Sequence, residues 1–446
     1  MLKDQLNTIR QKLERAKKRD SALAVFGAYS HKYQLNAPLP VEKLHAFERE
    51  HGIVLPEGYA MFLTELGNGG AGPYYGLYAL GEEQAIELDL IGEPYKPFLM
   101  GENAQSTDCE GSATDETESC PGLINIGTQG CSYEMMLVVT GEHRGKVLYI
   151  NMDDGQSFMT YEEHFLNWYE RWLDETIASY EDAWFGMSRG GNDLELTALY
   201  RSATDEKTRS EALQGMLKLP HLAEESVIFL IGEFRVCSGE IRRNAFRVLT
   251  KLCPSQAEGL VRVLLHSPDE EDRLTAMKCL TWYMPQEKHR FKDELLALLH
   301  HENNPESFRF LTMLLSDMGQ PMLSLMVPFF THSNSEIRQQ ALFKAGGAAG
   351  EEKAQVMDSF IEALEDPVMM VRLSALQALN GIQETRLLHV FEGLLQKHKT
   401  NKEYVRSNIS SLLQTFVFHS LAHMEQEVPE SLTQVRGLLR KQLGSL

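Results

Sequence analysis

Residue types that do chemistry are present in this chain, and their spacing can be compared with catalytic and metal-binding motifs. His419 and His423 lie four residues apart on a predicted helix, which is the spacing of two zinc ligands in metalloproteases. Ser420 stands where such a motif needs its general-base glutamate, so we expect both histidines to be ordinary helix residues. This pattern favours a binding protein over an enzyme.

A glycine-rich segment at 67–76 offers a candidate phosphate-binding loop. It lacks the Gly-Lys-Ser/Thr end of a P-loop, and no clear helix start follows it. We interpret the segment as a structural turn, because glycine readily adopts the positive φ that turns require. Within it, Tyr74 and Tyr75 form a candidate aromatic contact patch, although we expect one of the two to face the core.

Acidic residues and cysteines give two further candidate metal sites. The carboxylates at 102–120 suit a hard cation, but their spacing is not that of a calcium loop, and a solvated loop is the alternative. They are Asp108, Glu110, Asp115, Glu116 and Glu118. Cys109, Cys120 and Cys131 lie eleven residues apart and match no zinc pattern. We therefore predict no metal and no cofactor, and reduced thiols in a cytoplasmic protein.

Negative charge is concentrated in one part of the chain. The net charge is −20, and residues 51–200 hold 5 Lys/Arg against 26 Asp/Glu. A field of this sign attracts basic proteins and repels nucleic acid, whereas general solubility is the alternative explanation. The longest apolar run, 322–330, is interrupted by Ser324 and Pro328 and is too short to cross a membrane. We expect a basic protein partner, no nucleic acid and no membrane span.

Helices and strands alternate in the first 180 residues. Residues 1–20 predict a basic amphipathic helix, which either docks on a membrane surface or partner or packs its apolar stripe on the following domain. Pro56 and Glu57 suit a helix start. Residues 74–160 predict strands, with a hairpin over 138–150, and a helix is expected over about 161–177.

Four ordered motifs within about residues 35–180 resemble the SUKH superfamily, in its Smi/Knr-type branch. They are LPEGYAMFL, GNGGAGPYYGLYAL, GLINIGTQGCSYEMMLVVTGEHRGKVLYINMD and FLNWYERWLD. The resemblance implies an α+β fold in which helices flank an antiparallel sheet. It also implies a function in binding protein partners, as in the fungal cell-wall synthesis regulator and bacterial immunity proteins. We expect these residues to contact a partner: Glu57, Asn68, Tyr74, Tyr75, Asp108, Glu110, Asp153 and Asp154.

Beyond residue 193 the sequence repeats. Arginines recur at intervals of 29–36 residues, usually with a small residue three positions later and a large apolar residue four positions later; they are Arg209, Arg242, Arg273, Arg309, Arg338, Arg372 and Arg406. Such self-similarity predicts an all-α solenoid of HEAT-like or armadillo-like helix pairs over 194–446. It would follow a SUKH-like domain at 1–187 and a linker at 188–193. We expect the arginines to tie loops through hydrogen bonds.

These patterns predict a non-enzymatic protein-binding protein. In the first hypothesis it is an immunity-type protein that binds and neutralises a basic toxin domain, such as a nuclease. In the alternative it is a regulatory scaffold or adaptor whose helical repeats bind peptide or protein partners.

Overall fold

The chain forms two compact units, residues Met1–Cys253 and Pro254–Leu446. The structure is a computed structural model that describes residues 2–81, 122–397 and 402–444. The predicted contact residues Asp108 and Glu110, and the acidic segment around them, lie outside the described residues. Each unit is described below by itself.

The first unit contains a four-stranded antiparallel sheet with strand order β1-β2-β3-β4. The strands are β1 (Leu123–Gly130), β2 (Tyr133–Val138), β3 (Val147–Asn151) and β4 (Ser157–Met159). The hairpin predicted over 138–150 is confirmed, because β2 and β3 pair on either side of a turn. The prediction of strands from residue 74 is wrong for 74–81, where Leu77 forms only an isolated bridge with Gly70.

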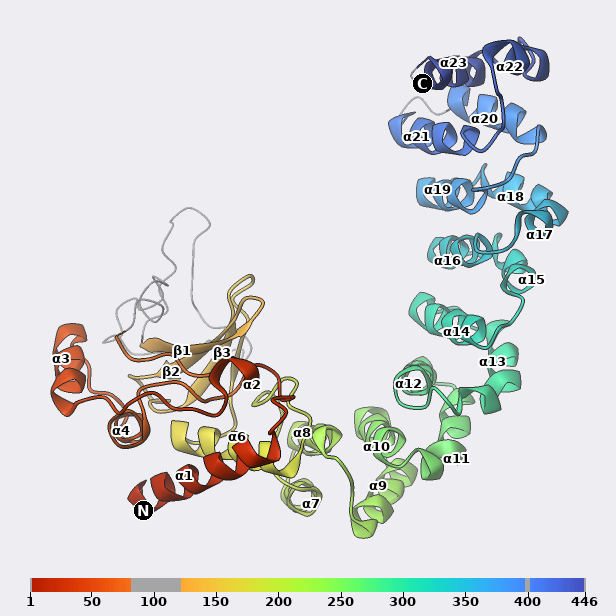
Figure 1. Cartoon of the computed structure of the whole chain (residues 1–446). Helices are drawn as coiled ribbons and strands as arrows, with labels where there is room; N and C mark the ends of the chain where they lie inside the picture. Colours follow the sequence, from red (N-terminus) through yellow and green to blue (C-terminus); the bar gives the residue numbers. More distant parts are fainter. Residues whose placement is uncertain (1, 82–121, 398–401, 445–446) are drawn as a thin grey trace. The chain divides into compact units, whose positions relative to one another are not determined.

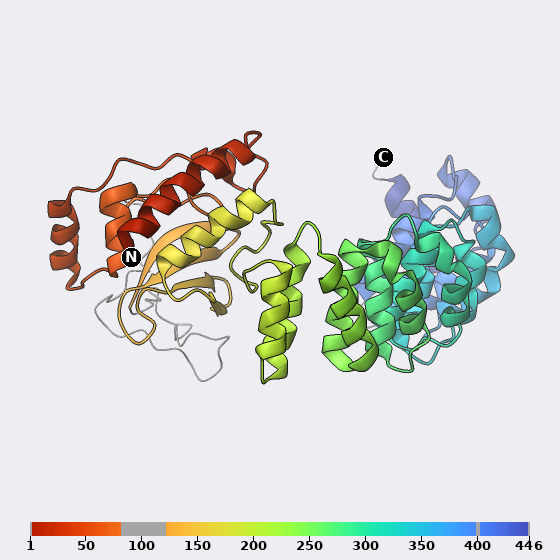
Figure 2. The same cartoon turned by 90° about the horizontal axis from the view of Figure 1, so that it is seen from below.

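Helices cover one face of this sheet and enclose the main core. They are α1 (Leu2–Arg19), α2 (Ala28–His31), α3 (Val41–His51), α4 (Glu57–Met61), the π-helical turn η1 (Phe62–Leu66) and α6 (Phe165–Ala178). Helices α1 and α6 lie side by side (Figures 1 and 2). The apolar stripe of α1 is buried, and Lys12 pairs with Glu170 and Asp174 of α6. The first helix therefore packs on its own domain.

Four further helices complete the first unit. They are α7 (Asp193–Ser202), α8 (Glu206–Gly215), α9 (Glu224–Val236) and α10 (Gly239–Leu252), with the 3-10 turn η2 (Met216–Lys218) after α8. Residues 188–192 precede α7, which begins at Asp193, and the whole of 188–193 lies inside this unit, whereas the chain divides after Cys253. The segment is packed, because Arg171 donates to the Ser188 carbonyl and Arg189 pairs with Glu211.

The second unit is entirely helical in its described part. Its helices are α11 (Pro254–Leu265), α12 (Glu270–Trp282), α13 (Lys292–Leu299), α14 (Pro305–Asp317), α15 (Met322–Met326), α16 (Ser335–Ala345), α17 (Gly350–Gln355), α18 (Met357–Ala363), α19 (Met369–Ala378), α20 (Arg386–Lys397), α21 (Lys402–Leu413), α22 (Leu421–Glu427) and α23 (Thr433–Leu443); the short 3-10 turns η3 (Lys288–Phe291) and η4 (Val327–Phe329) precede α13 and follow α15. Helices α12, α14, α16, α19 and α21 pack in succession (Figure 1). Within the described ranges, no helix of either unit is long and apolar enough to span a bilayer.

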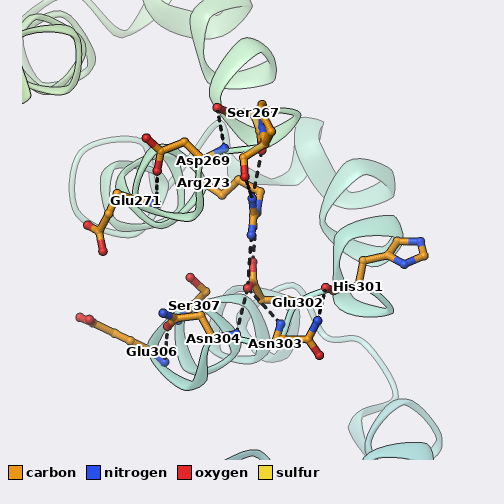
Figure 3. Close-up of polar contacts among 11 residues, drawn as sticks. Ser267, Asp269, Glu271, Arg273, His301, Glu302, Asn303, Asn304, Glu306 and Ser307 are labelled. Carbon is orange, nitrogen blue, oxygen red and sulfur yellow. Dashed lines mark hydrogen bonds and ion pairs between the residues drawn. The ribbon is translucent and has the colours of Figure 1, made fainter. Parts of the chain in front are cut away.

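Each recurring arginine lies on the second helix of a pair, and several of them tie loops as predicted. Arg273 donates to the carbonyls of Ser267 and Pro268 in the loop before its helix and pairs with Glu302 of the next loop (Figure 3). Arg209, Arg338 and Arg372 likewise bind the carbonyl six positions earlier. Arg309 is an exception, because its side chain is exposed.

The residue three positions after each arginine is fully buried. These residues are Ala212, Ala245, Ala276, Thr312, Ala341, Ala375 and Ile409. Four polar residues lie four positions before an arginine at a helix N-cap; the side chains of Asp205, Asp269 and Asn334 accept a backbone N–H, whereas the Ser238 side chain does not. The sequence periodicity therefore corresponds to a repeated packing position on consecutive helix pairs.

Candidate interaction surface

The two neighbouring tyrosines of the glycine-rich turn point in different directions. Tyr74 is buried and its hydroxyl donates to the Phe185 carbonyl at 2.9 Å. Burial raises the pKa of Tyr74, so its phenol stays protonated at physiological pH. Tyr75 is partly exposed and faces the surface. The turn therefore presents one aromatic side chain and uses the other to anchor itself.

Tyr75 belongs to a group of exposed aromatic residues from separate segments. The Phe26 and Tyr75 rings meet edge to face, with centroids 5.4 Å apart, and the Tyr29 ring lies 6.3 Å from that of Tyr75. Phe26 is 50% exposed and Tyr29 is 62% exposed. Large apolar side chains exposed together are uncommon on a surface that contacts only water.

The group continues across the β1–β2 turn. The Tyr75 ring lies beside Gly130, where an added Cβ would come within 3.0 Å of it, and Gly130 pairs with Tyr133 across the hairpin. The Tyr133 ring meets that of Trp184 edge to face at 5.5 Å, and Trp184 is 57% exposed. We call these five residues the aromatic patch: Phe26, Tyr29, Tyr75, Tyr133 and Trp184. Tyrosine and tryptophan are the residue types most often found at the energetic centres of protein interfaces.

Two predicted contact residues, Asp153 and Asp154, lie beside this patch. Both are exposed in the β3–β4 turn, and the Met152 N–H just before them donates to the Ser132 carbonyl in the β1–β2 turn. The two turns are therefore adjacent, and the carboxylates of Asp153 and Asp154 belong to the turn next to the one that leads into Tyr133. Such a surface suits a partner that offers apolar and basic groups together.

The other two predicted contact residues that the structure describes lie away from the aromatic patch. Glu57 begins α4, whose next residue, Gly58, packs against Leu166 of α6. The Asn68 side chain accepts the Leu80 N–H and its backbone N–H donates to the Ala37 carbonyl, so Asn68 closes the glycine-rich turn. The structure does not bring either residue to the aromatic patch.

A buried charge network lies beneath the segment that carries Trp184. Arg171 pairs with Glu162 and Glu175, and Lys218 also binds Glu175. Burial lowers the pKa of Lys218 to about 8, despite the attraction of Glu175. The Arg171 guanidinium also lies 5.3 Å from the Phe185 ring centroid. These contacts fix residues 182–188, and hence Trp184, on the domain.

Sequence reasoning missed Phe26, Tyr29, Tyr133 and Trp184. Phe26, Tyr29 and Trp184 belong to no recognisable motif, and Tyr133 lies in the third SUKH-like motif without being singled out there; the four are separated by up to 158 positions in the chain. One local signal was available: Trp184 lies among acidic residues, alanine and glycine, which is not the composition of a buried segment. Their proximity depends on the fold, and only the structure reveals it.

The other candidate sites have structural explanations. In the glycine-rich turn, the N–H groups of Gly70 and Ala71 donate to the Leu77 and Gln34 carbonyls, so they are not available to a phosphate. His423 pairs with Glu427 at 2.8 Å. The described part of the chain contains no group of three or more His, Cys, Asp or Glu side chains placed to hold a metal ion.

Comparisons with known proteins give little further guidance. No protein-family model matches the sequence. No curated protein matches it either. Among solved structures, the chain is similar to the X-ray structure of YibA from Escherichia coli, with 17% sequence identity, a TM-score of 0.38, and coverage of 56% of this chain and 92% of YibA. Likeness at this level does not establish a shared fold or function.

Proposed function

We propose that this chain is a non-enzymatic, cytoplasmic protein-binding protein whose first unit binds a basic protein partner through the aromatic patch. The observation that carries the proposal is the exposure of Phe26, Tyr29 and Trp184 on one surface with Asp153 and Asp154 beside them. Exposed aromatic side chains supply apolar area to an interface, and flanking carboxylates favour a basic partner.

Within this proposal the first unit is a SUKH-like domain and the partner is a toxin domain that the protein neutralises. The four-stranded antiparallel sheet with α1 and α6 on one face supports this proposal, since the SUKH resemblance implies that arrangement. The charge of residues 51–200 also supports it, because an acidic field speeds association with a basic protein and makes binding sensitive to salt.

The second part of the proposal concerns the helical pairs. Buried small residues at a fixed register and arginines that bind preceding loops support a HEAT-like solenoid. Exposed apolar residues on these helices favour a second candidate function, that of a scaffold for another client. Trp282 on α12 is 57% exposed and Phe343 on α16 is 72% exposed.

Two tryptophans of equal exposure separate these functions. The full chain and its Trp184→Ala and Trp282→Ala variants are co-expressed with any toxin domain that a neighbouring gene encodes, and survival and co-purification are measured. We expect Trp184→Ala to lower affinity at least tenfold, because buried interface tryptophans contribute 2 kcal/mol or more. Trp282→Ala should bind as the parent does. If only Trp282→Ala loses co-purification, the scaffold function is favoured. If the parent chain does not protect cells from the toxin domain, the immunity function is refuted.

A further inference from the structure

A cleft opens beside the aromatic patch in the first unit. It encloses about 260 Å³ between the end of α1, the end of α6 and residues 182–185. Small-molecule sites usually enclose about 300–1,000 Å³, so this cleft fits a side chain better than a whole cofactor. Trp172 and Phe185 form apolar parts of its wall.

The cleft and the aromatic patch share a wall. Val25 lines the cleft and the next residue, Phe26, belongs to the patch. The Phe26 N–H donates to Asp182 Oδ2 at 2.5 Å, and Asp182 and Phe185 of the cleft flank Trp184 of the patch. A partner seated on the patch therefore reaches the mouth of the cleft directly.

Two carboxylates in the cleft have neutral hydrogen-bond donors. Asp20 is buried and accepts the N–H groups of Ala24 and Val25 and the Tyr33 hydroxyl. Asp182 accepts the Phe26 N–H. Among the described residues, neither carboxylate forms an ion pair. Neutral donors orient both side chains, and no cationic side chain neutralises them. The third carboxylate of the cleft, Glu175, is already paired with Arg171 and Lys218.

Backbone dipoles add to the negative potential here. Helix α1 ends at Arg19 and helix α6 ends at Ala178, and residues at both ends line the cleft. The carboxyl end of a helix carries a partial negative charge. Arg19 stands at the rim, but its Nε donates to the Ser179 hydroxyl at 2.7 Å and makes no pair with Asp20 or Asp182.

From this geometry we infer that the cleft receives an arginine side chain of the protein partner, between Asp20, Asp182 and the aromatic wall. A guanidinium is favoured over an ammonium because it is flat, binds carboxylates with several N–H groups and stacks on aromatic rings. The apolar stem of the arginine would lie along Val25 and Phe26. The assignment of this arginine to a protein partner rests on the proposed function, whereas arginine binding by the cleft can be tested without a partner.

The test is isothermal titration of the full chain with N-acetyl-argininamide, a neutral-ended arginine analogue. We expect saturable binding in the millimolar range. Asp182→Asn should weaken this binding at least tenfold because it removes the negative charge. The asparagine oxygen can still accept the Phe26 N–H, so the local structure should be kept. Asp20→Asn is the second variant, and circular dichroism checks that both fold. The matched control is Asp174→Asn on α6, an exposed carboxylate that does not line the cleft.

Two analogues test the chemistry. N-acetyl-norleucinamide, which lacks the charge, should not bind. Equal or tighter binding of N-acetyl-lysinamide would overturn the assignment of a guanidinium. The inference fails if argininamide shows no saturation up to about 50 mM, or if Asp182→Asn and Asp20→Asn bind it as the parent does. If the cleft does not bind argininamide while Trp184→Ala still impairs partner binding, the proposed function stands and only the arginine site is refuted.

Discussion

The sharpest stability test of the second unit concerns two arginines at the same register position. Arg338 binds four oxygen atoms, namely the carbonyls of His332 and Ser333 and both carboxylate oxygens of Asp366. The side chains of Arg338 and Asp366 are only 11% and 9% exposed. Arg309 is 61% exposed and has one distant ion pair at 3.8 Å.

Replacing Arg338 by methionine leaves a nearly buried carboxylate without its cation. Breaking a buried pair in this way costs about 3–5 kcal/mol, whereas an exposed substitution such as Arg309→Met should cost no more than about 0.5 kcal/mol. Replacing both partners in Arg338→Met/Asp366→Leu removes the orphan charge. This double variant should recover at least half of the loss.

Hydrogen exchange followed by mass spectrometry is the suitable assay, because a chain with two units need not unfold in one step. Amides of α16 in Arg338→Met should exchange about two to four orders of magnitude faster than in the parent, since about 1.4 kcal/mol corresponds to tenfold. Equal protection in Arg338→Met and Arg309→Met would refute the reasoning. So would a double variant no better protected than the single one.

Three further predictions concern buried side chains. Burial lowers the pKa of His31 to about 4, below its ordinary 6.5, so the unfolded chain binds the proton first as the pH falls. The free energy of unfolding should therefore fall between pH 6.5 and 4. In urea unfolding, this fall should be smaller in His31→Gln by up to about 3 kcal/mol. The pKa of Lys218, about 8, is also below its ordinary 10.5, so its contribution to stability should rise between pH 8 and 10, and Lys218→Met should lack this rise. Leu376→Asp should melt α19 by introducing a carboxyl at a fully buried position, whereas Gln377→Asp on the exposed face should not change circular dichroism.

Sequence reasoning worked where one residue type has one dominant role in its surroundings. The recurrence of Arg273, Arg338 and Arg372 predicted their role because a guanidinium near a helix start readily reaches the preceding carbonyls. The hairpin at 138–150 was predictable because β-branched residues flank turn residues. In both cases the decisive contacts are local in the sequence.

The rest depended on long-range contacts. Residues 74–81 have strand composition, yet Leu77 forms an isolated bridge with Gly70 and the Tyr78 N–H donates to the Ile126 carbonyl of β1, and these contacts do not extend into a strand. The aromatic patch combines residues from position 26 to position 184. Whether Tyr74 or Tyr75 faced the core also depended on the fold, since Phe185 supplies the acceptor for Tyr74.

The packing of residues 188–193 has a consequence for how this chain can be divided. A fragment that ends at residue 187 keeps Glu175 and Tyr161 but loses Lys218, which binds Glu175, and Arg189, which lies 4.1 Å from the Tyr161 ring centroid. The shortest fragment that retains these partners extends at least to Lys218. The sheet domain and its first helical pair should therefore be expressed as one fragment, and cleavage between them should destabilise both.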